Sequence, residues 1–270
     1  MSSEPDSDAA LLQAARLGDR QAIESLLSRY EHRIYRFALR QCGDEQDARD
    51  TLQETMIAAL HGLRDFRGEA RLSTWLYQIA RSFCIKHRRP GHTVRGGAAL
   101  SEADAIASPD AAPDARTHAR ELGAAIATAM SALPDSYREA VVLRDVEGLS
   151  AEEAAEVAGI EVAALKSRLH RGRLELRSHL AALLGETDAA APCPELAQEL
   201  SAYVAADIDQ STCARVEDHL ARCPRCAGAC DALKRTVSLC RRIPGDAVPV
   251  AVRTAVQRAL RAATTGNPAP

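Results

Sequence analysis

Four thiol and imidazole side chains late in the sequence have the spacing of a metal site. The pattern is C-x25-H-x3-C-x2-C, formed by Cys193, His219, Cys223 and Cys226. His219 and Cys223 are one helical turn apart, so both side chains can reach one ion, and the C-x2-C pair makes a compact chelating turn. Four such ligands suit tetrahedral zinc, while thiolates also accept Cu(I) or Cd(II). We therefore expect zinc, with copper or cadmium as alternative ions; the competing interpretation is a group of unconnected buried cysteines.

The remaining cysteines carry a weaker pattern. The sequence has eight cysteines, and in a reducing compartment this number favours metal or redox chemistry over structural disulfides. Cys213, Cys230 and Cys240 accompany the metal set, and they are either small buried hydrophobic residues or a redox- or metal-sensing group. Cys42 and Cys84 lie in helices of the N-terminal part, where we interpret them as core residues.

A second chemical signal is a basic helix that follows a tight turn. Residues 150–177 read as a helix, a turn at Gly159 and a basic helix, which is the order of a helix-turn-helix. In the second helix, Leu165 and Leu169 are spaced to face inward, which leaves polar residues on the outer side. Lysine, arginine, serine and histidine can bind phosphates or base edges. The candidate DNA-binding residues of this helix are Lys166, Ser167, Arg168, His170, Arg171 and Arg173. The alternative is a helical hairpin whose basic residues face solvent.

Residues 81–89 form another basic cluster. The stretch holds Arg81, Lys86, His87, Arg88 and Arg89 and no acidic residue. The net charge of the sequence is −3, which argues against a protein covered in positive charge but leaves local patches free to bind nucleic acid. Such runs are often solvated helix faces, so the cluster alone does not establish DNA binding.

The elements that must position these groups are helical. Hydrophobic residues make up 46% of the sequence, many of them alanine, and aromatic residues only 3%, which favours helices rich in Ala and Leu. No stretch alternates Val, Ile, Thr and Tyr as a strand would. We therefore predict an all-α protein with two small helical domains, the second a helix-turn-helix, and a small helical metal-binding C-terminal domain.

Breaks in the helical spacing divide the chain. We predict a first domain at residues 9–90, a flexible linker at 91–116, a second domain at 117–184, a metal-binding domain at 193–240 and an extension at 241–270. The linker is rich in Gly, Pro, Ala, Ser and Asp. Within the domains, one helix is expected to start near Asp44 and another at Ser73, which would be its N-cap. A third is expected to start at Ser150, where Glu153 completes a capping box.

Two groups of motifs resemble one known family. The stretch "LPDSYREAVVLRDVEGLSAEEAAEVAGIEVAALKSRLHRGRLELR" is similar to region 4 of the extracytoplasmic-function (ECF) sigma factors of the sigma-70 family. "DARDTLQETMIAAL" followed by "FRGEARLSTWLYQIARSFCIKHRR" is similar to their region 2. Both stand in the family's order and spacing, over about residues 9–180. The resemblance implies a sigma factor, which directs RNA polymerase core enzyme to promoter DNA and initiates transcription.

The resemblance also implies roles for individual residues. Four polar residues at helical spacing would dock on the clamp coiled coil of polymerase: Asp47, Asp50, Gln53 and Glu54. The turn at residues 66–72 and the helix at 73–89 would capture and melt the −10 element, and the helix-turn-helix would read the −35 element. In region 2 the implied DNA-binding residues are Arg67, Arg81, Ser82, Lys86, Arg88 and Arg89. Trp75 is assigned to the core rather than to stacking on a base.

The cysteine-rich segment resembles a second family. "LSAYVAADIDQSTCARVEDHLARCPRC" is similar to the zinc-binding anti-sigma domain, with "VAADI" where "LDGEL" is usual. In that family the domain normally belongs to a separate protein that holds a sigma factor inactive. Its fusion here implies an intramolecular contact between the tail and the sigma domains. A change in metal or thiol state would then shift the balance between occluded and open forms.

Other function classes are excluded or kept as alternatives. Residues 1–8 are polar and acidic, unlike a signal peptide, and no apolar run is long enough to span a bilayer. We therefore expect a cytoplasmic protein with no membrane partner. No nucleophile, base and orienting group can be assembled, and four protein ligands would fill the metal site, so we expect no enzyme. The alternatives are a helix-turn-helix DNA-binding regulator or a metal-sensing protein, neither of which would act through core polymerase.

Overall fold

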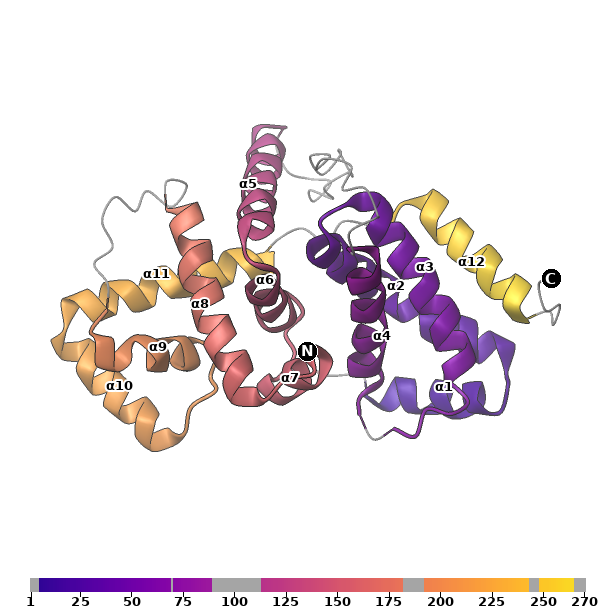
Figure 1. The fold of residues 1–270 in the computed structure, drawn as a ribbon, viewed down its shortest axis with the longest axis horizontal. Helices are drawn as coiled ribbons and strands as arrows, with labels where there is room; N and C mark the ends of the chain where they lie inside the picture. Colours follow the sequence, from indigo (N-terminus) through magenta and orange to yellow (C-terminus); the bar gives the residue numbers. More distant parts are fainter. Residues whose placement is uncertain (1–4, 69, 89–112, 182–191, 243–247, 265–270) are drawn as a thin grey trace. The chain divides into compact units, whose positions relative to one another are not determined.

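The computed structural model describes residues 5–68, 70–88, 113–181, 192–242 and 248–264, and every regular element in these ranges is helical (Figure 1). The all-α prediction is therefore confirmed. The elements group into two compact units, Met1–Pro109 with Gly245–Pro270, and Asp110–Pro244. Most of the predicted linker at 91–116 lies outside the described residues. A search of the described helices finds none with the length and apolar content needed to cross a membrane.

The first unit contains α1 (Pro5–Arg16), α2 (Arg20–Cys42), α3 (Glu45–Gly62), α4 (Leu72–His87) and α12 (Val250–Thr264). The turn between α2 and α3 is two residues long. Gly43 adopts a left-handed conformation (φ 79°) that ends α2, and the Asp44 carboxylate accepts hydrogen bonds from the backbone N–H groups of Gln46 and Asp47. The helix therefore starts where the sequence predicts. The Ser73 N-cap is wrong, because α4 begins at Leu72 and its N-cap residue is Arg71.

The core of the first unit lies between α2, α3 and α4. Leu26, Leu27, Ile34 and Phe37 of α2 are fully buried, as are Leu52 and Met56 of α3 and Leu76 of α4. The rings of Phe37 and Tyr77 meet edge to face with their centroids 5.3 Å apart. This packing fixes α3 and α4 side by side, so that the polar residues of both helices face away from the core.

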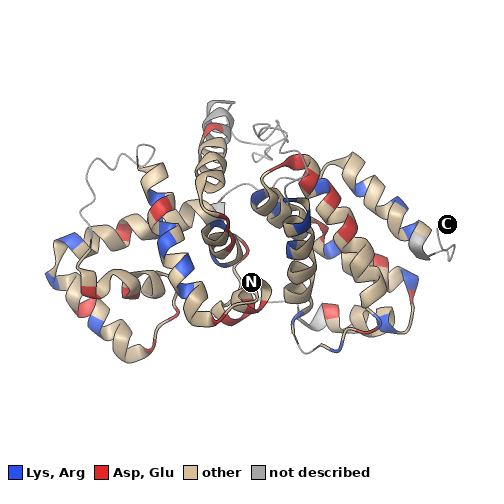
Figure 2. Cartoon of the chain, viewed as in Figure 1, with Lys and Arg blue, Asp and Glu red and all other residues tan. Residues whose placement is uncertain are grey.

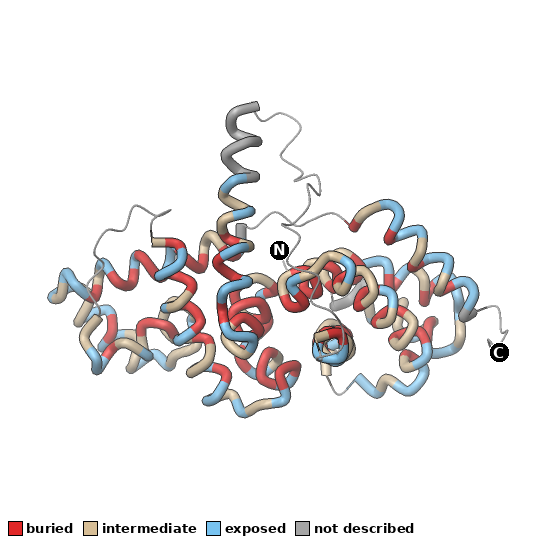
Figure 3. Tube along the Cα trace, turned by 45° about the horizontal axis from the view of Figure 1, so that its top comes forward, coloured by how far each residue is buried: buried red, intermediate tan, exposed pale blue. Residues whose placement is uncertain are grey.

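The last helix, α12, packs on α3 and α2. Its buried residues Val252, Val256 and Leu260 recur every four positions and form one apolar stripe, which Val248, just before the helix, extends. The opposite side of the helix is exposed (Figure 3). Arg253 contributes an ion pair of 3.7 Å with Glu31 of α2, whose own burial raises its pKa.

The second unit contains the predicted helix-turn-helix and the cysteine-rich segment. Its elements are α5 (Pro113–Ala132), α6 (Asp135–Val141), the π-helical turn η1 (Val142–Val146), α7 (Ala151–Ala158), α8 (Val162–Leu180), the 3-10 turn η2 (Pro194–Leu196), α9 (Ala197–Val204), α10 (Gln210–Arg222) and α11 (Pro224–Arg242). The capping box between Ser150 and Glu153 is confirmed, and Gly159 makes the left-handed turn (φ 64°) between α7 and α8.

The cysteine-rich segment, residues 193–242, has a small core of its own. Leu196, Leu200, Val216, Ala229 and Cys230 form it, and Tyr203, Val204 and Leu220 pack around them. The segment does not stand alone, because α9 and α11 both pack on α8 and α11 also packs on η1. The helix predicted to bind DNA therefore has the cysteine-rich segment on one side.

Candidate nucleic-acid interface and metal centre

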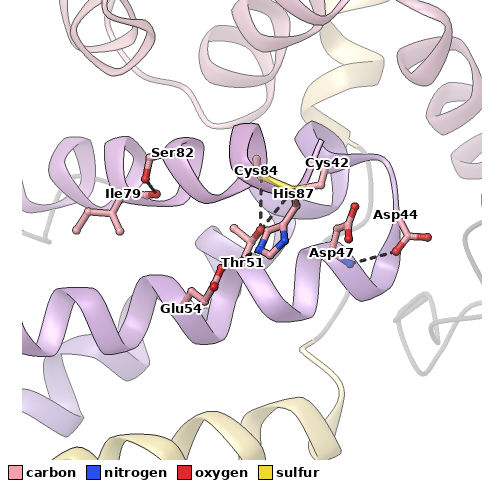
Figure 4. Close-up of a disulfide and its surroundings, with 9 residues drawn as sticks. All are labelled: Cys42, Asp44, Asp47, Thr51, Glu54, Ile79, Ser82, Cys84 and His87. Atoms are coloured by element: carbon pink, nitrogen blue, oxygen red, sulfur yellow. Dashed lines mark hydrogen bonds and ion pairs between the residues drawn. A yellow bond between two sulfur atoms is a disulfide. The ribbon is translucent and has the colours of Figure 1, made fainter. Parts of the chain in front are cut away.

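The four polar residues predicted to bind polymerase lie on α3, between its first and third turns. Gln53 is exposed, and Asp47, Asp50 and Glu54 are partly exposed. The carboxylate of Asp50 accepts a hydrogen bond of 3.0 Å from Gln46. The carboxylate of Glu54 reaches α4 (Figure 4), where it is 2.7 Å from His87 Nε2 and 3.2 Å from Lys86 Nζ. The face predicted to bind polymerase is thus linked through Glu54 to the end of α4.

The basic residues predicted to bind DNA in the first unit lie on α4 and on the loop before it. Lys86 is exposed and Arg81 and Arg88 are partly exposed, while Arg89 lies outside the described residues. Ser82 is exposed, but its hydroxyl donates a hydrogen bond of 2.7 Å to the carbonyl oxygen of Ile79.

The loop before α4 has an aromatic anchor. The ring of Phe66 packs 5.1 Å from Trp75, and the guanidinium of Arg16 lies 5.7 Å above the Phe66 ring. Trp75 also packs closely against Gly62, but it is only partly buried and is not one of the buried core residues. An open hollow beside this anchor is lined by Arg16, Arg64, Asp65, Phe66 and Arg67, so that Arg67 borders a space open to a ligand.

The second basic surface lies on α8, where Lys and Arg recur along the helix (Figure 2). Leu165 and Leu169 are buried as predicted. Lys166 and Arg171 are exposed, and Ser167, Arg168 and His170 are partly exposed. Arg171 lies 3.4 Å from the Tyr137 hydroxyl. Burial, with smaller contributions from the charges of Arg173 and Arg171, lowers the pKa of His170, which favours its neutral form.

Arg173 does not belong to this surface. Its side chain is 1% exposed and forms a two-pronged ion pair with the buried carboxylate of Asp145 in η1. A third N–H group donates to the carbonyl oxygen (2.7 Å) and the hydroxyl (3.0 Å) of Ser201 in α9. In this structure Arg173 cannot contact DNA. It instead joins the helix-turn-helix to the cysteine-rich segment, a role that the sequence analysis missed.

A second contact between these parts involves Asp207, in the loop between α9 and α10. Its carboxylate forms an ion pair with Arg144 of η1, whose side chain is 9% exposed. Its backbone carbonyl oxygen accepts a hydrogen bond of 3.2 Å from Nζ of Lys166. One of the predicted DNA-binding groups is thereby already bonded to the cysteine-rich segment.

The four predicted metal ligands come together. Cys193 precedes η2, His219 lies in α10, Cys223 ends α10 and Cys226 lies in the first turn of α11, and their ligand atoms are all within 4.8 Å of one another. Cys226 is fully buried. A hydrogen bond from the Cys226 backbone N–H, together with a weaker one from the His219 side chain, lowers the pKa of Cys223 to about 7. Burial raises the pKa of Cys226.

The chemistry of this cluster fits a bound cation. His219 Nε2 is buried and has no hydrogen-bond partner among the described residues, which is costly unless another group fills that role. The three thiol sulfurs of the cluster lie within 4.8 Å of one another and of a ring nitrogen of His219, and they can lose their protons to a metal ion. Of the other cysteines in the segment, Cys230 and Cys240 are buried and Cys213 lies 3.6 Å from Glu217.

Cys42 and Cys84 are buried, which confirms their assignment to the core, but the structure adds a bond. The two sulfur atoms form a disulfide that joins Cys42, the last residue of α2, to Cys84 in α4 (Figure 4). Their 42-residue separation gave no local signal for this pairing.

Comparisons with known proteins agree with this organisation. The model of "Sigma-70 region 2" matches residues 26–91, "Sigma-70, region 4" matches 123–176, and "Putative zinc-finger" matches 193–227. The chain is 34% identical to the ECF RNA polymerase sigma factor SigE of Mycolicibacterium smegmatis over 63% of this chain and 67% of that protein. It is 32% identical to the RNA polymerase sigma-H factor of Pseudomonas aeruginosa, over 67% of this chain and 97% of that protein. It is also 32% identical to the ECF RNA polymerase sigma factor SigW of Bacillus subtilis, over 60% of this chain and 91% of that protein.

A solved structure, CnrH in complex with the cytosolic domain of CnrY, is 27% identical with a TM-score of 0.47 and covers 67% of this chain and 99% of that one. The two sigma-70 regions, their order and the 32% identity to SigW over 91% of that protein lead to one conclusion: the chain belongs to the ECF RNA polymerase sigma factors, which direct RNA polymerase to promoters, and it carries a fused C-terminal zinc-finger domain.

Proposed function

We propose that region 2 holds core polymerase through the polar face of α3, formed by Asp47, Asp50, Gln53 and Glu54. The exposure of Gln53 and the partial exposure of the three acids support this assignment. The same region would hold the −10 element on α4, through Arg81, Ser82, Lys86, Arg88 and Arg89, and in the hollow beside Arg67. Melting requires a base to be held outside the stack, and a basic hollow next to aromatic rings offers such a place.

Region 4 reads the −35 element through the outer side of α8 in this proposal. Lys166, Ser167, Arg168, His170 and Arg171 are the contacting residues, and Arg173 is left out because it is buried. A neutral His170 would act as a hydrogen-bonding group rather than as a cation.

The fused domain would regulate region 4 by covering part of its DNA-binding surface. The main support for this proposal is the hydrogen bond from Lys166 Nζ to the carbonyl oxygen of Asp207, because a lysine that makes this bond is not available to a phosphate. The ion pair between Arg144 and Asp207 and the Arg173 contacts to Ser201 hold the domain there. Opening of this contact would release α8 for the promoter.

We propose zinc as the resident ion, with a structural role. Cys193, His219, Cys223 and Cys226 would hold it, and when bound it cross-links η2, α10 and α11. The loop that carries Asp207 lies between these elements, so the ion keeps the inhibitory surface in shape. Exchange for copper or cadmium would act at the same ligands. We further propose that the chain catalyses no reaction and works in the cytoplasm, where its polymerase and promoters are.

The experiment is transcription with purified core polymerase on promoter templates. We expect the reduced, full-length chain to bind core polymerase and to direct initiation. Metal removal by a chelator should raise initiation as the fused domain releases α8. Failure to bind core polymerase would favour a simple helix-turn-helix regulator. A metal-storage or sensing protein would bind neither polymerase nor DNA.

A further inference from the structure

A pair of cysteines joins two helices of region 2, far in sequence from the metal ligands. Cys42 is the last residue of α2 and Cys84 lies near the end of α4, and their Cα atoms are 5.3 Å apart. Cys84 is fully buried and Cys42 retains 8% of its surface. The α2–α3 turn at Gly43 and the packing of α4 fix this approach, so the two sulfur atoms are held within bonding reach.

The surroundings of the pair connect it to both predicted surfaces of region 2. The hydroxyl of Thr51, from the polymerase-facing helix α3, is 3.5 Å from the sulfur of Cys42 and 3.8 Å from that of Cys84 (Figure 4). One turn after Thr51, Glu54 pairs with Lys86 and His87, which lie two and three residues after Cys84. Cys84 and the two residues that bond Glu54 therefore belong to the same turn of α4.

We propose that Cys42 and Cys84 form a reversible redox site of region 2, with a peroxide as the oxidant. The proposal rests on the cytoplasmic location and on the polymerase contact of Glu54 given above. Thiols in that compartment are kept reduced, so a cysteine pair that can bond there is formed and broken rather than permanent. The pair uses none of the metal ligands, so its state is separate from that of the zinc-finger domain.

The disulfide forms in two balanced steps, each of which releases one molecule of water. Cys42, the more exposed partner, attacks one oxygen of hydrogen peroxide, which gives a sulfenic acid on Cys42 and one molecule of water. The Cys84 thiol then attacks the Cys42 sulfur, which forms the disulfide and releases a second water. Both thiols are oxidised and the peroxide is reduced. A dithiol reductant reverses the bond through a mixed disulfide.

The disulfide changes how α4 is held. In the bonded form the end of α4 is tied to α2, which keeps Lys86 and His87 against Glu54. Two free thiols need a larger separation than two bonded sulfur atoms, so reduction loosens this turn and releases Glu54 toward polymerase. Oxidised protein should therefore bind core polymerase more weakly than reduced protein, by about fivefold, the effect of about one hydrogen bond.

The test uses the full-length, metal-loaded chain with stepwise hydrogen peroxide. Non-reducing peptide mapping after alkylation of the denatured protein measures the link between residues 42 and 84, and fluorescence titration measures core polymerase affinity. The test variant combines Cys42→Ala with Cys84→Ala. The matched control combines Cys230→Ala with Cys240→Ala, which also removes two buried thiols outside the metal set. Circular dichroism checks the helical content of each, and the single Cys42→Ala variant serves if the pair variant does not fold.

The expected result is a linked 42–84 peptide that dithiothreitol removes, with a parallel, reversible loss of core affinity in the wild type and the control but not in the pair variant. Three results would overturn the proposal: both thiols stay open to alkylation after peroxide, the link persists in dithiothreitol, or the pair variant loses affinity to the same extent. If reduced wild type fails to bind core polymerase at all, the proposed function has failed instead.

Discussion

Replacement of Asp207 by alanine tests whether the fused domain restrains region 4. The carboxylate of Asp207 pairs with Arg144, and both side chains are largely shielded from solvent, at 18% and 9% exposure. The Nε atom of Arg144 is already buried with no partner among the described residues, so loss of the carboxylate leaves this guanidinium poorly satisfied. A charged hydrogen bond of this kind contributes about 2 kcal/mol. The docked arrangement should weaken by that amount.

The consequence for DNA binding follows from the equilibrium between docked and released forms. About 2 kcal/mol shifts this equilibrium roughly 30-fold toward release. Affinity for a −35 duplex, measured by fluorescence anisotropy at fixed salt, should rise by up to that factor, and transcription should rise with it. Asp231→Ala removes an exposed acid of α11 and is the matched control, because both changes alter the net charge equally. Equal or lower affinity of Asp207→Ala, in a protein with unchanged helical content, would refute the reasoning.

The remaining predictions concern stability. Arg173→Met leaves the buried Asp145 carboxylate without its partner and should cost about 3–5 kcal/mol, seen as a fall in Tm that addition of Asp145→Leu recovers; no fall would mean that the pair is dispensable. The pKa of His170 is lowered by burial, so the unfolded chain binds the proton more readily and stability should fall as pH drops below about 6.5. Urea midpoints at pH 7.5 and 5.5 measure this, and His170→Gln should reduce the difference. Ala206 has φ 57°, so Ala206→Gly should stabilise the α9–α10 loop by about 0.5–1 kcal/mol, whereas Ala205→Gly, at φ −82°, should not. Val256→Asp puts a charge into the buried stripe of α12 and should increase hydrogen exchange in that helix, while exposed Gln257→Asp should leave it unchanged.

The sequence predicted those features whose signals are local. The metal cluster follows from one helical turn between His219 and Cys223 and from a C-x2-C turn, and only Cys193 comes from farther away. The outward side of α8 follows from the spacing of Leu165 and Leu169. The capping box needs only the backbone geometry of Ser150 and Glu153.

The features that could not be predicted from the sequence depend on contacts between distant segments. Arg173 stands in a run of basic residues and looked like a DNA contact, and only the approach of Asp145 and Ser201, each 28 residues away, explains its burial. The disulfide joins residues 42 positions apart. Ala206 and Asp207 belong to the segment "VAADI", which stands where the zinc-binding anti-sigma domain usually has "LDGEL". The left-handed conformation of Ala206 gives a physical reason for the usual glycine there, and the bonds of Asp207 give the departure a consequence.

Fusion changes how strong the contact between the zinc-finger domain and region 4 has to be. A separate inhibitor must bind tightly enough to find its target at cellular concentration, whereas a domain on a short linker is present at an effective concentration in the millimolar range. Contacts that are individually weak, such as Lys166 with the Asp207 carbonyl, then suffice to keep the domain docked. The same weakness lets promoter DNA compete, because a ligand shifts such an equilibrium only by its differential affinity for the two forms. The buried Arg173–Asp145 pair lies apart from this competition, since it does not face DNA. We therefore expect substitutions at Asp207 to change promoter affinity with a smaller fall in Tm than substitutions at Arg173, which should change both. If the two positions proved indistinguishable in these assays, the division between a displaceable contact and a permanent one would be wrong.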